Sequence, residues 1–499
     1  MRCAVLAVVA AACAGRASPP APSPGAPPPF AAARWVPARP LYVLASPSVA
    51  DAQRAARGAI DLLASVTGHD LRDAVRASAA LFGVDALHAD PVAAIGIDPA
   101  GGWALFGGEP GSPGALSPTM VVRLASPGQF AAFLDRQRER GLVTRSVIVD
   151  HTEITSAALP DGIAIRWAIE ADWLWVHVAL AGEADREARW FTASHGRHDA
   201  AWSGGWAWAQ HAAGAAANVV GLLDLHGALA GGIARLPDAV ACAKLAESIG
   251  RVSLAVEGDD HHVAARLAFD LGSTERLRGL VLPPPGGWDA AARTAAIAAQ
   301  WNLDLAGARP YAAPCLSAIG APVGLADQTG VRAARAMLVA FDPDALSGTG
   351  AIALDLSSTA YLDRQLDRIP LRSALERSRT FGPYRGHAIA IPFSVTVDYV
   401  LEPRLAIAAI GDGLLARLAA PRSASAPAPI AAIDVAPPAM SAHAWEALID
   451  TLADRGWGVS AARQSTGQVV SQLMAWRDAH LAVTAEAGEL VVTVAGDRR

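Results

Sequence analysis

Two stretches of the chain, 232 residues apart, share one pattern of apolar and polar positions. The first covers residues 120–136, the second covers 352–368, and each ends in Leu-Asp-Arg. In both, an alternating apolar run leads to a serine, and apolar residues then recur with the spacing of one helix face. Because serine is a common first residue of helices, each stretch predicts a strand, a turn and an amphipathic helix.

A second pattern follows each of these stretches. Strand-like, helix-like and strand-like segments occur in this order at 221–226, around Cys242 and at 252–256, and again at 432–435, 445–452 and 481–483. A repeat this long indicates two copies of a domain, since solenoid repeats have periods of about 20–50 residues.

The local patterns favour antiparallel hairpins. Apolar residues alternate on both sides of a Gly-Asp-Asp turn within 251–270, and the same alternation surrounds a turn within 163–180. Alanine-rich stretches such as 49–65 and 290–300 are expected to form helices over these hairpins. The predicted fold class is therefore α+β, with two tandem copies of a domain built from antiparallel hairpins and sheets packed with alanine-rich helices.

Proline-rich breaks at 282–288 and 420–429 help to place the boundaries of these parts. The expected organisation is a signal peptide at 1–12, a Pro-rich tether at 13–40, a first copy at 41–285 (A unit 41–200, B unit 201–285), a second A unit at 286–420, and a second B unit at 421–499 after a Pro/Ala/Ser linker.

The start of the chain indicates export. One positive charge at Arg2 precedes an apolar segment at 4–12 and then Cys13, which is the layout of a secretory signal. The segment is shorter than the about 20 residues that span a bilayer. Ala10-Ala-Ala-Cys13 looks like a bacterial lipoprotein processing site with Ala10 in place of the usual leucine, and Cys13 is then the lipidation site. A conventionally cleaved secreted protein and a cytoplasmic protein with an apolar start are the alternatives.

Composition agrees with a folded body on a tether. Residues 14–29 are rich in Pro, Ser and Ala and favour extended polyproline conformations. The whole chain is 52% hydrophobic and 18% charged, so the body can bury large cores. The net charge of −6 argues against nucleic-acid binding, which requires a basic face. In an oxidising compartment, Cys242 and Cys315 are expected disulfide partners, and two separate buried thiols are the alternative.

The chain resembles a known class of proteins in its signal, its Pro-rich tether, its repeated strand–turn–helix, and two stretches before a strand, Phe82-Gly-Val-Asp85 and Gly96-Ile-Asp-Pro99. These features are similar to those of predicted envelope lipoproteins of unknown function from GC-rich Gram-negative bacteria. The resemblance covers most of the chain and implies a duplicated fold and a location in the cell envelope, facing the periplasm or the exterior. It carries over no catalytic residue.

Several enzyme signatures are absent from the sequence. The only lysine, Lys244, follows Ala243 and so cannot complete a P-loop, and there is no Gly-x-Ser-x-Gly, His-Glu-x-x-His or Cys-x-x-Cys motif. The weak metal candidate is His195 with His198 and Asp199, which a turn could bring onto one zinc ion; a polar loop is the alternative. We therefore expect no cofactor and no catalytic residue.

Tryptophans provide the candidate binding surface. The period of two places Trp173, Trp175 and His177 on one face of a strand, opposite Leu174 and its apolar neighbours. A second cluster contains Trp202, Trp206 and Trp208. Exposed indoles would contact an apolar ligand or a partner, whereas helices of the same domain would cover them in the alternative interpretation.

These inferences favour a non-enzymatic, lipid-anchored envelope protein that reaches the membrane through its N-terminal anchor and binds an apolar ligand or a protein partner. A structural or assembly lipoprotein without a ligand is the alternative, and a metal-dependent hydrolase is the third hypothesis.

Overall fold

The computed structural model describes residues 30–37, 40–67, 71–109, 116–149, 151–158, 163–179, 217–230, 249–259, 261–308, 329–345, 347–370, 372–391, 395–420, 428–454 and 466–499. They divide into two compact units. We call the described parts of Ala14–Leu62 and His69–Asp270 the N-terminal unit, and those of Leu63–Gly68 and Leu271–Arg499 the C-terminal unit.

An antiparallel sheet forms the N-terminal unit. Its strands are β1 (Tyr42–Ser46), β2 (Trp103–Phe106), β3 (Thr119–Arg123), β4 (Thr144–Val149), β5 (Thr152–Ala158), β6 (Ala164–Glu170), β7 (Trp173–Ala179), β8 (Val219–Asp224), β9 (Arg251–Gly258) and β10 (His262–Asp270). They pair in the order β4-β5-β6-β7-β3-β2-β1-β8-β9-β10. The helices in this part of the chain are η1 (Ala31–Trp35), α2 (Val49–Thr67), α3 (Leu71–Phe82), α4 (Ala89–Ala94), α5 (Pro127–Glu139) and α8 (Leu225–Ala230).

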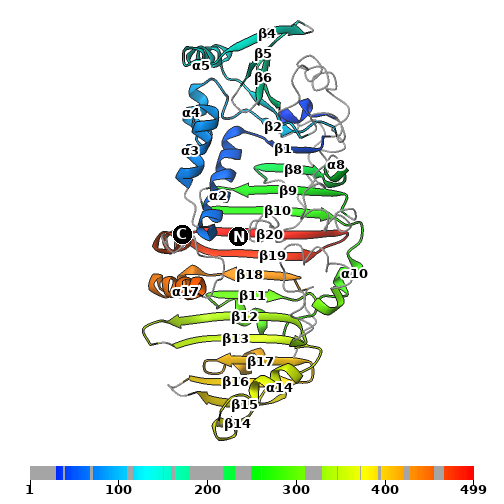
Figure 1. Cartoon of the computed structure of the whole chain (residues 1–499), viewed down its shortest axis with the longest axis vertical. Coiled ribbons are helices and arrows are strands. Elements are labelled where there is room, and N and C mark those ends of the chain that lie inside the picture. Colours follow the sequence, from blue (N-terminus) through cyan, green and yellow to red (C-terminus); the bar gives the residue numbers. More distant parts are fainter. Residues whose placement is uncertain are drawn as a thin grey trace, which may run out of the picture. The chain divides into compact units, whose positions relative to one another are not determined.

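The C-terminal unit is also an antiparallel sheet. Its strands are β11 (Ile297–Trp301), β12 (Val331–Asp342), β13 (Ser347–Leu356), β14 (Glu376–Phe381), β15 (Tyr384–Ile391), β16 (Val395–Glu402), β17 (Leu405–Ile410), β18 (Ala431–Val435), β19 (Trp476–Ala485) and β20 (Glu489–Arg498). They pair in the order β14-β15-β16-β17-β13-β12-β11-β18-β19-β20 (Figure 1). Its helices are α10 (Glu275–Arg278), α11 (Trp288–Ala292), α14 (Ala360–Leu366), α15 (Arg372–Leu375), α16 (Leu414–Leu418), η4 (Pro437–Ala439), α17 (Ala442–Asp454) and α18 (Thr466–Leu473).

Local sequence explains several of these elements, and the corresponding predictions are confirmed. Ser126 caps α5, because its hydroxyl accepts a hydrogen bond from the Gln129 N–H at 3.2 Å and Pro127 starts the helix. The 251–270 hairpin is β9 and β10, and the Asp259 carboxylate accepts hydrogen bonds from two N–H groups in its turn. The 163–180 hairpin is β6 and β7.

Gly96 shows why the stretch before β2 needs a glycine. Its φ of 87° lies in the left-handed region, and a Cβ at this position would lie 2.3 Å from the Ser126 carbonyl oxygen. The Gly96 carbonyl also accepts hydrogen bonds from the N–H groups of Ala125 and Ser126. The turn before α5 therefore packs directly against the backbone of Gly96, which leaves no room for a side chain there.

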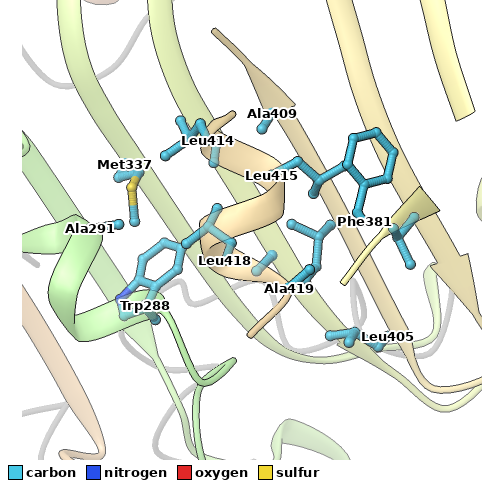
Figure 2. Packing of buried hydrophobic residues seen from close by; sticks show 14 of the residues in the cluster. Trp288, Ala291, Met337, Phe381, Leu405, Ala409, Leu414, Leu415, Leu418 and Ala419 are labelled. Carbon is cyan, nitrogen blue, oxygen red and sulfur yellow. The ribbon is translucent and has the colours of Figure 1, made fainter. Parts of the chain in front are cut away.

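The core of the C-terminal unit lies between one face of its sheet and two short helices. Trp288 of α11 and three leucines of α16 pack on buried residues of the sheet such as Met337 and Ala409 (Figure 2). Gly287 allows the close approach of the two helices, because a Cβ there would lie 1.8 Å from the Arg417 carbonyl oxygen.

A buried polar network joins β12 and β13 to Asn302, the residue that follows β11. The Arg335 guanidinium donates to Asp355 Oδ2 at 2.7 Å, to Asn302 Oδ1 at 2.6 Å and to the Leu282 carbonyl oxygen at 3.0 Å. The Arg335 side chain is 0% exposed and that of Asp355 is 10% exposed. The charge is thus buried with an acceptor on each of its three nitrogens, as a buried arginine requires.

The predicted fold class, α+β in two tandem copies of hairpins covered by alanine-rich helices, is wrong. The hairpins join edge to edge into long antiparallel sheets, and strands hold more of the described residues than helices do. Residues 49–65 do form a helix, but 290–300 contain only the end of α11 and most of β11. Alanine has a high intrinsic helix propensity, but its small side chain also fits a tightly packed strand. Ala298 of β11 is an example, because it is buried at 3% exposure.

In the part of the chain that the structure describes, no helix has the length and apolar character needed to cross a bilayer.

Candidate functional site

One face of the C-terminal sheet carries a row of apolar residues. Ile352 is paired with Ala336 on one side and Ala408 on the other, Ala336 is paired with Ala299, and Ala299 with Ile433. Directly paired residues of antiparallel strands point to the same face, so these five side chains form one row across β18, β11, β12, β13 and β17.

The rows on either side of it are also apolar. Positions two residues away along a strand share its face, which adds Ile410 on one side and Trp301 on the other. We call this surface the open face: Ala299, Trp301, Ala334, Ala336, Ile352, Leu354, Ala406, Ala408, Ile410, Ala431 and Ile433. None of these residues can carry a charge.

The open face is accessible to solvent. Ile352 is 52% exposed, Ile433 is 43% exposed, and Trp301 and Ile410 are each 36% exposed. Four of the seven exposed large hydrophobic residues among the described residues therefore lie on this one surface. An antiparallel sheet that is covered on one side normally presents polar residues on the other, and an uncovered apolar patch marks a binding surface.

Helices α17 and α18 cover the part of the sheet that adjoins the open face, but the cluster that they form contains no open-face residue. Trp445 and Val470 pack on Ile297, Leu338 and Val435, which precede or follow open-face residues by two positions on their strands. The reverse side of the sheet packs on α11 and α16. The sheet therefore packs on α11 and α16 with its reverse side and on α17 and α18 beside the open face, and the open-face residues belong to neither cluster.

Polar side chains lie at one end of the open face. The apolar row continues from Ala408 to Tyr399 on β16 and His387 on β15, and Glu376 on β14 lies in the neighbouring row. The Tyr399 hydroxyl donates to the Glu376 carboxylate, and Arg372 donates to the Tyr399 hydroxyl at 3.1 Å and to Glu376 Oε2 at 3.1 Å. We call these four residues the polar cluster.

His387 completes the polar cluster by stacking and charge. Its ring stacks on Tyr399 with centroids 5.3 Å apart and planes 22° apart. Its Nδ1 lies 3.0 Å from Glu376 Oε1 but is not aligned for a hydrogen bond, so the contact is electrostatic and depends on protonation of the ring.

Glu376 is ionised and Tyr399 is neutral at pH 7. Burial raises the pKa of Glu376, but hydrogen bonds from Tyr399 and Arg372 outweigh it and hold that pKa below its usual value. Burial and the hydrogen bond to Glu376 raise the pKa of Tyr399 above its usual value. The cluster offers a partly exposed guanidinium, carboxylate and imidazole beside an apolar surface, and no activated nucleophile among these four residues.

The tryptophan face predicted on β7 is buried. Trp173, Trp175 and His177 are at most 6% exposed, and Trp35 of η1 packs on the two indoles with ring centroids 6.1 Å and 5.2 Å away. Burial and Arg166 lower the pKa of His177 to about 4, and its Nδ1 lies 2.9 Å from Thr119 Oγ1. These side chains therefore do not present a surface to a ligand or partner.

Helix η1, which covers the indoles of β7, lies within residues 13–40, the range predicted to form the Pro-rich tether. Phe30, Ala32 and Val36 are buried in the same cluster as Trp173 and Trp175. The folded part of the N-terminal unit thus begins before residue 41, the boundary expected from proline content.

The other predicted site residues lie outside the described residues: Cys13, Cys242, Cys315, Trp202, Trp206, Trp208, His195, His198 and Asp199. Lipidation, the disulfide, the second tryptophan cluster and the weak metal candidate remain predictions. Among the residues that are described, no three His, Cys, Asp or Glu side chains are grouped closely enough to hold a metal ion.

The open face is not among the binding surfaces predicted from the sequence. The signal for it is that β17 is apolar at both parities: Ala406, Ala408 and Ile410 on one side, Leu405, Ile407 and Ala409 on the other. Such a strand is expected to be covered on both faces.

No protein-family model matches the chain, and no curated protein matches it. Among solved structures, crystal forms I, III and IV of TP0453 are similar at 9%, 11% and 11% sequence identity. The matches cover 48–50% of this chain and 80–82% of those chains, with TM-scores of 0.28–0.29.

Proposed function

We propose that this is a non-enzymatic, lipid-anchored envelope protein whose C-terminal unit binds the acyl chain of an amphiphile along the open face. The observation that carries the proposal is an uncharged sheet surface on which Ile352, Ile433, Trp301 and Ile410 remain exposed. Anchoring at Cys13 rests on the sequence alone.

The composition of the apolar row suits an alkyl chain. Ala299 and Ala336 are small and lie between the larger Ile433 and Ile352, so a chain along the row would contact alanine beneath it and isoleucine at each end of that span. Each methylene removed from water contributes about 0.8 kcal/mol, and the row offers no charged group whose desolvation would oppose this.

The length of the row also fits. From Ile433 on β18 to Tyr399 on β16 there are five steps between neighbouring strands, or about 24 Å at roughly 4.8 Å a step. One leaflet of a bilayer fills half of a hydrocarbon core about 30 Å thick, so one acyl chain of a membrane lipid needs about 15 Å.

The polar cluster supplies the other half of an amphiphile site. A chain lying on the row toward Tyr399 places its head group beside His387, Glu376 and Arg372. These side chains offer hydrogen-bond donors and an acceptor to a head group that leaves water.

The test is binding of palmitate to the full chain, measured by displacement of an environment-sensitive fluorescent probe. Native mass spectrometry of protein purified from its host envelope would identify the natural amphiphile. We expect Ile352→Asp to weaken palmitate binding roughly tenfold or more, which corresponds to about 1.4 kcal/mol.

Ile148→Asp is the matched control, because Ile148 is an exposed strand isoleucine in the N-terminal unit, outside the open face. Its palmitate affinity should equal that of the unmodified chain. Equal affinities for both variants, or no binding by the unmodified chain, would refute the proposal, and the second result favours the structural or assembly role.

A further inference from the structure

Strand β4 is the end strand of the N-terminal sheet. In the described part of that unit it pairs with β5 alone, over six consecutive residue pairs from Thr144–Ala157 to Val149–Thr152, without a bulge. The backbone groups on its other edge are therefore directed away from the sheet. Such an edge is a template for another strand.

The sequence of β4 does nothing to block that pairing. Residues 143–149 read Val-Thr-Arg-Ser-Val-Ile-Val, in which five residues are β-branched and one is charged. Val143 is 82% exposed and Ile148 is 79% exposed, the largest exposures among the large hydrophobic residues of the described ranges. Proteins usually protect an exposed edge with charges, proline or a bulge.

The end strand of the other sheet, β14, has this protection. It reads Glu-Arg-Ser-Arg-Thr-Phe, with three charges in six residues. The two end strands are of equal length and each has a serine at its third position, Ser146 in β4 and Ser378 in β14. The contrast therefore concerns the side chains that flank the serine.

We propose that β4 pairs antiparallel with β4 of a second copy of this chain. A two-fold axis at Ser146 places Arg145 opposite Val147 and Thr144 opposite Ile148, so like charges do not meet. Val143 would lie opposite Val149, and the exposed Ile148 would gain a neighbour. The same axis at Ser378 of β14 would place Arg377 opposite Arg379, which opposes self-pairing there.

Two substitutions at the axis test this pairing in the full chain. Ser146→Cys should form a disulfide-linked dimer under mild oxidation by copper phenanthroline, beyond any cross-linking of the unmodified chain, because the two introduced thiols face each other. Ser146→Lys should convert a dimer into a monomer by sedimentation velocity, because two lysines would then lie directly opposite.

Ser378→Cys and Ser378→Lys are the matched controls on β14. They should give no added cross-link and leave the dimer intact, and far-UV circular dichroism should show that all four variants are folded. A monomeric unmodified chain overturns the proposal, including a monomer that captures a strand from another protein. A dimer that survives Ser146→Lys overturns it as well.

Discussion

The Arg335–Asp355 pair gives the sharpest test of how the C-terminal unit is stabilised. Asp355→Ala removes the acceptor that lies 2.7 Å from the Arg335 guanidinium and leaves a charge buried at 0% exposure. Breaking a buried pair from one side costs about 3–5 kcal/mol, because the remaining charge loses the opposite charge beside it but stays out of water. We expect the free energy of unfolding to fall by about that amount.

The assay is guanidinium unfolding followed by circular dichroism and tryptophan fluorescence. Asp478→Ala is the control, because Asp478 and Arg477 form a pair of similar length, 2.8 Å, whose side chains are at least half exposed. Its loss of stability should be much smaller than that of Asp355→Ala, because water and salt screen exposed pairs.

The double variant separates charge from packing. Arg335→Met with Asp355→Leu removes both charges and keeps the volume, so it should recover part of the stability lost in Asp355→Ala; the recovery is partial because Asn302 Oδ1 and the Leu282 carbonyl oxygen lose the donor that Arg335 provides. Equal small losses for Asp355→Ala and Asp478→Ala would refute the reasoning, as would a double variant no more stable than Asp355→Ala.

Three further outcomes follow from individual residues. Gly96→Ala should lower the free energy of unfolding, measured by thermal denaturation, by about 1–3 kcal/mol or more, because its φ of 87° is combined with a clash against Ser126. Gly141→Ala is the control: Gly141 has a φ of 100° but no atom within 4 Å of the added Cβ, so the loss should be smaller. Because the pKa of Glu376 is lowered in the folded state, its stabilisation is present above the unfolded pKa and lost as pH falls, so Glu376→Gln should flatten the acid limb of a stability–pH curve. Trp35→Ala should expose the indoles of β7 and increase quenching of tryptophan fluorescence by iodide.

The sequence predicts local elements well because their signals are local. Alternation on both sides of Asp259 identifies β9 and β10, and Ser126 identifies the start of α5, since each depends on residues within one turn or hairpin. The fold class depends on how hairpins join and on what covers them. Alanine content does not decide this, as β11 shows.

The candidate site could not be predicted for the same reason. A period of two separates Trp175 from Leu174 but does not say which face of β7 is covered. In the structure both are buried, Trp175 beneath η1 and Leu174 beneath α5, and the uncovered apolar face lies on β13 and its neighbours instead. Coverage is a long-range property, set by elements far away in the chain.

The reason the open face is open lies in the helix that follows β13. In the N-terminal unit, α5 follows β3 and packs Phe130, Phe133 and Leu134 on β3, β6 and β7. Helix α14 follows β13 in the same way, but it has seven residues where α5 has thirteen, and none of them is buried. A helix this short cannot lay an apolar stripe across several strands, so Ile352 of β13 and Ile410 of β17 stay exposed to solvent.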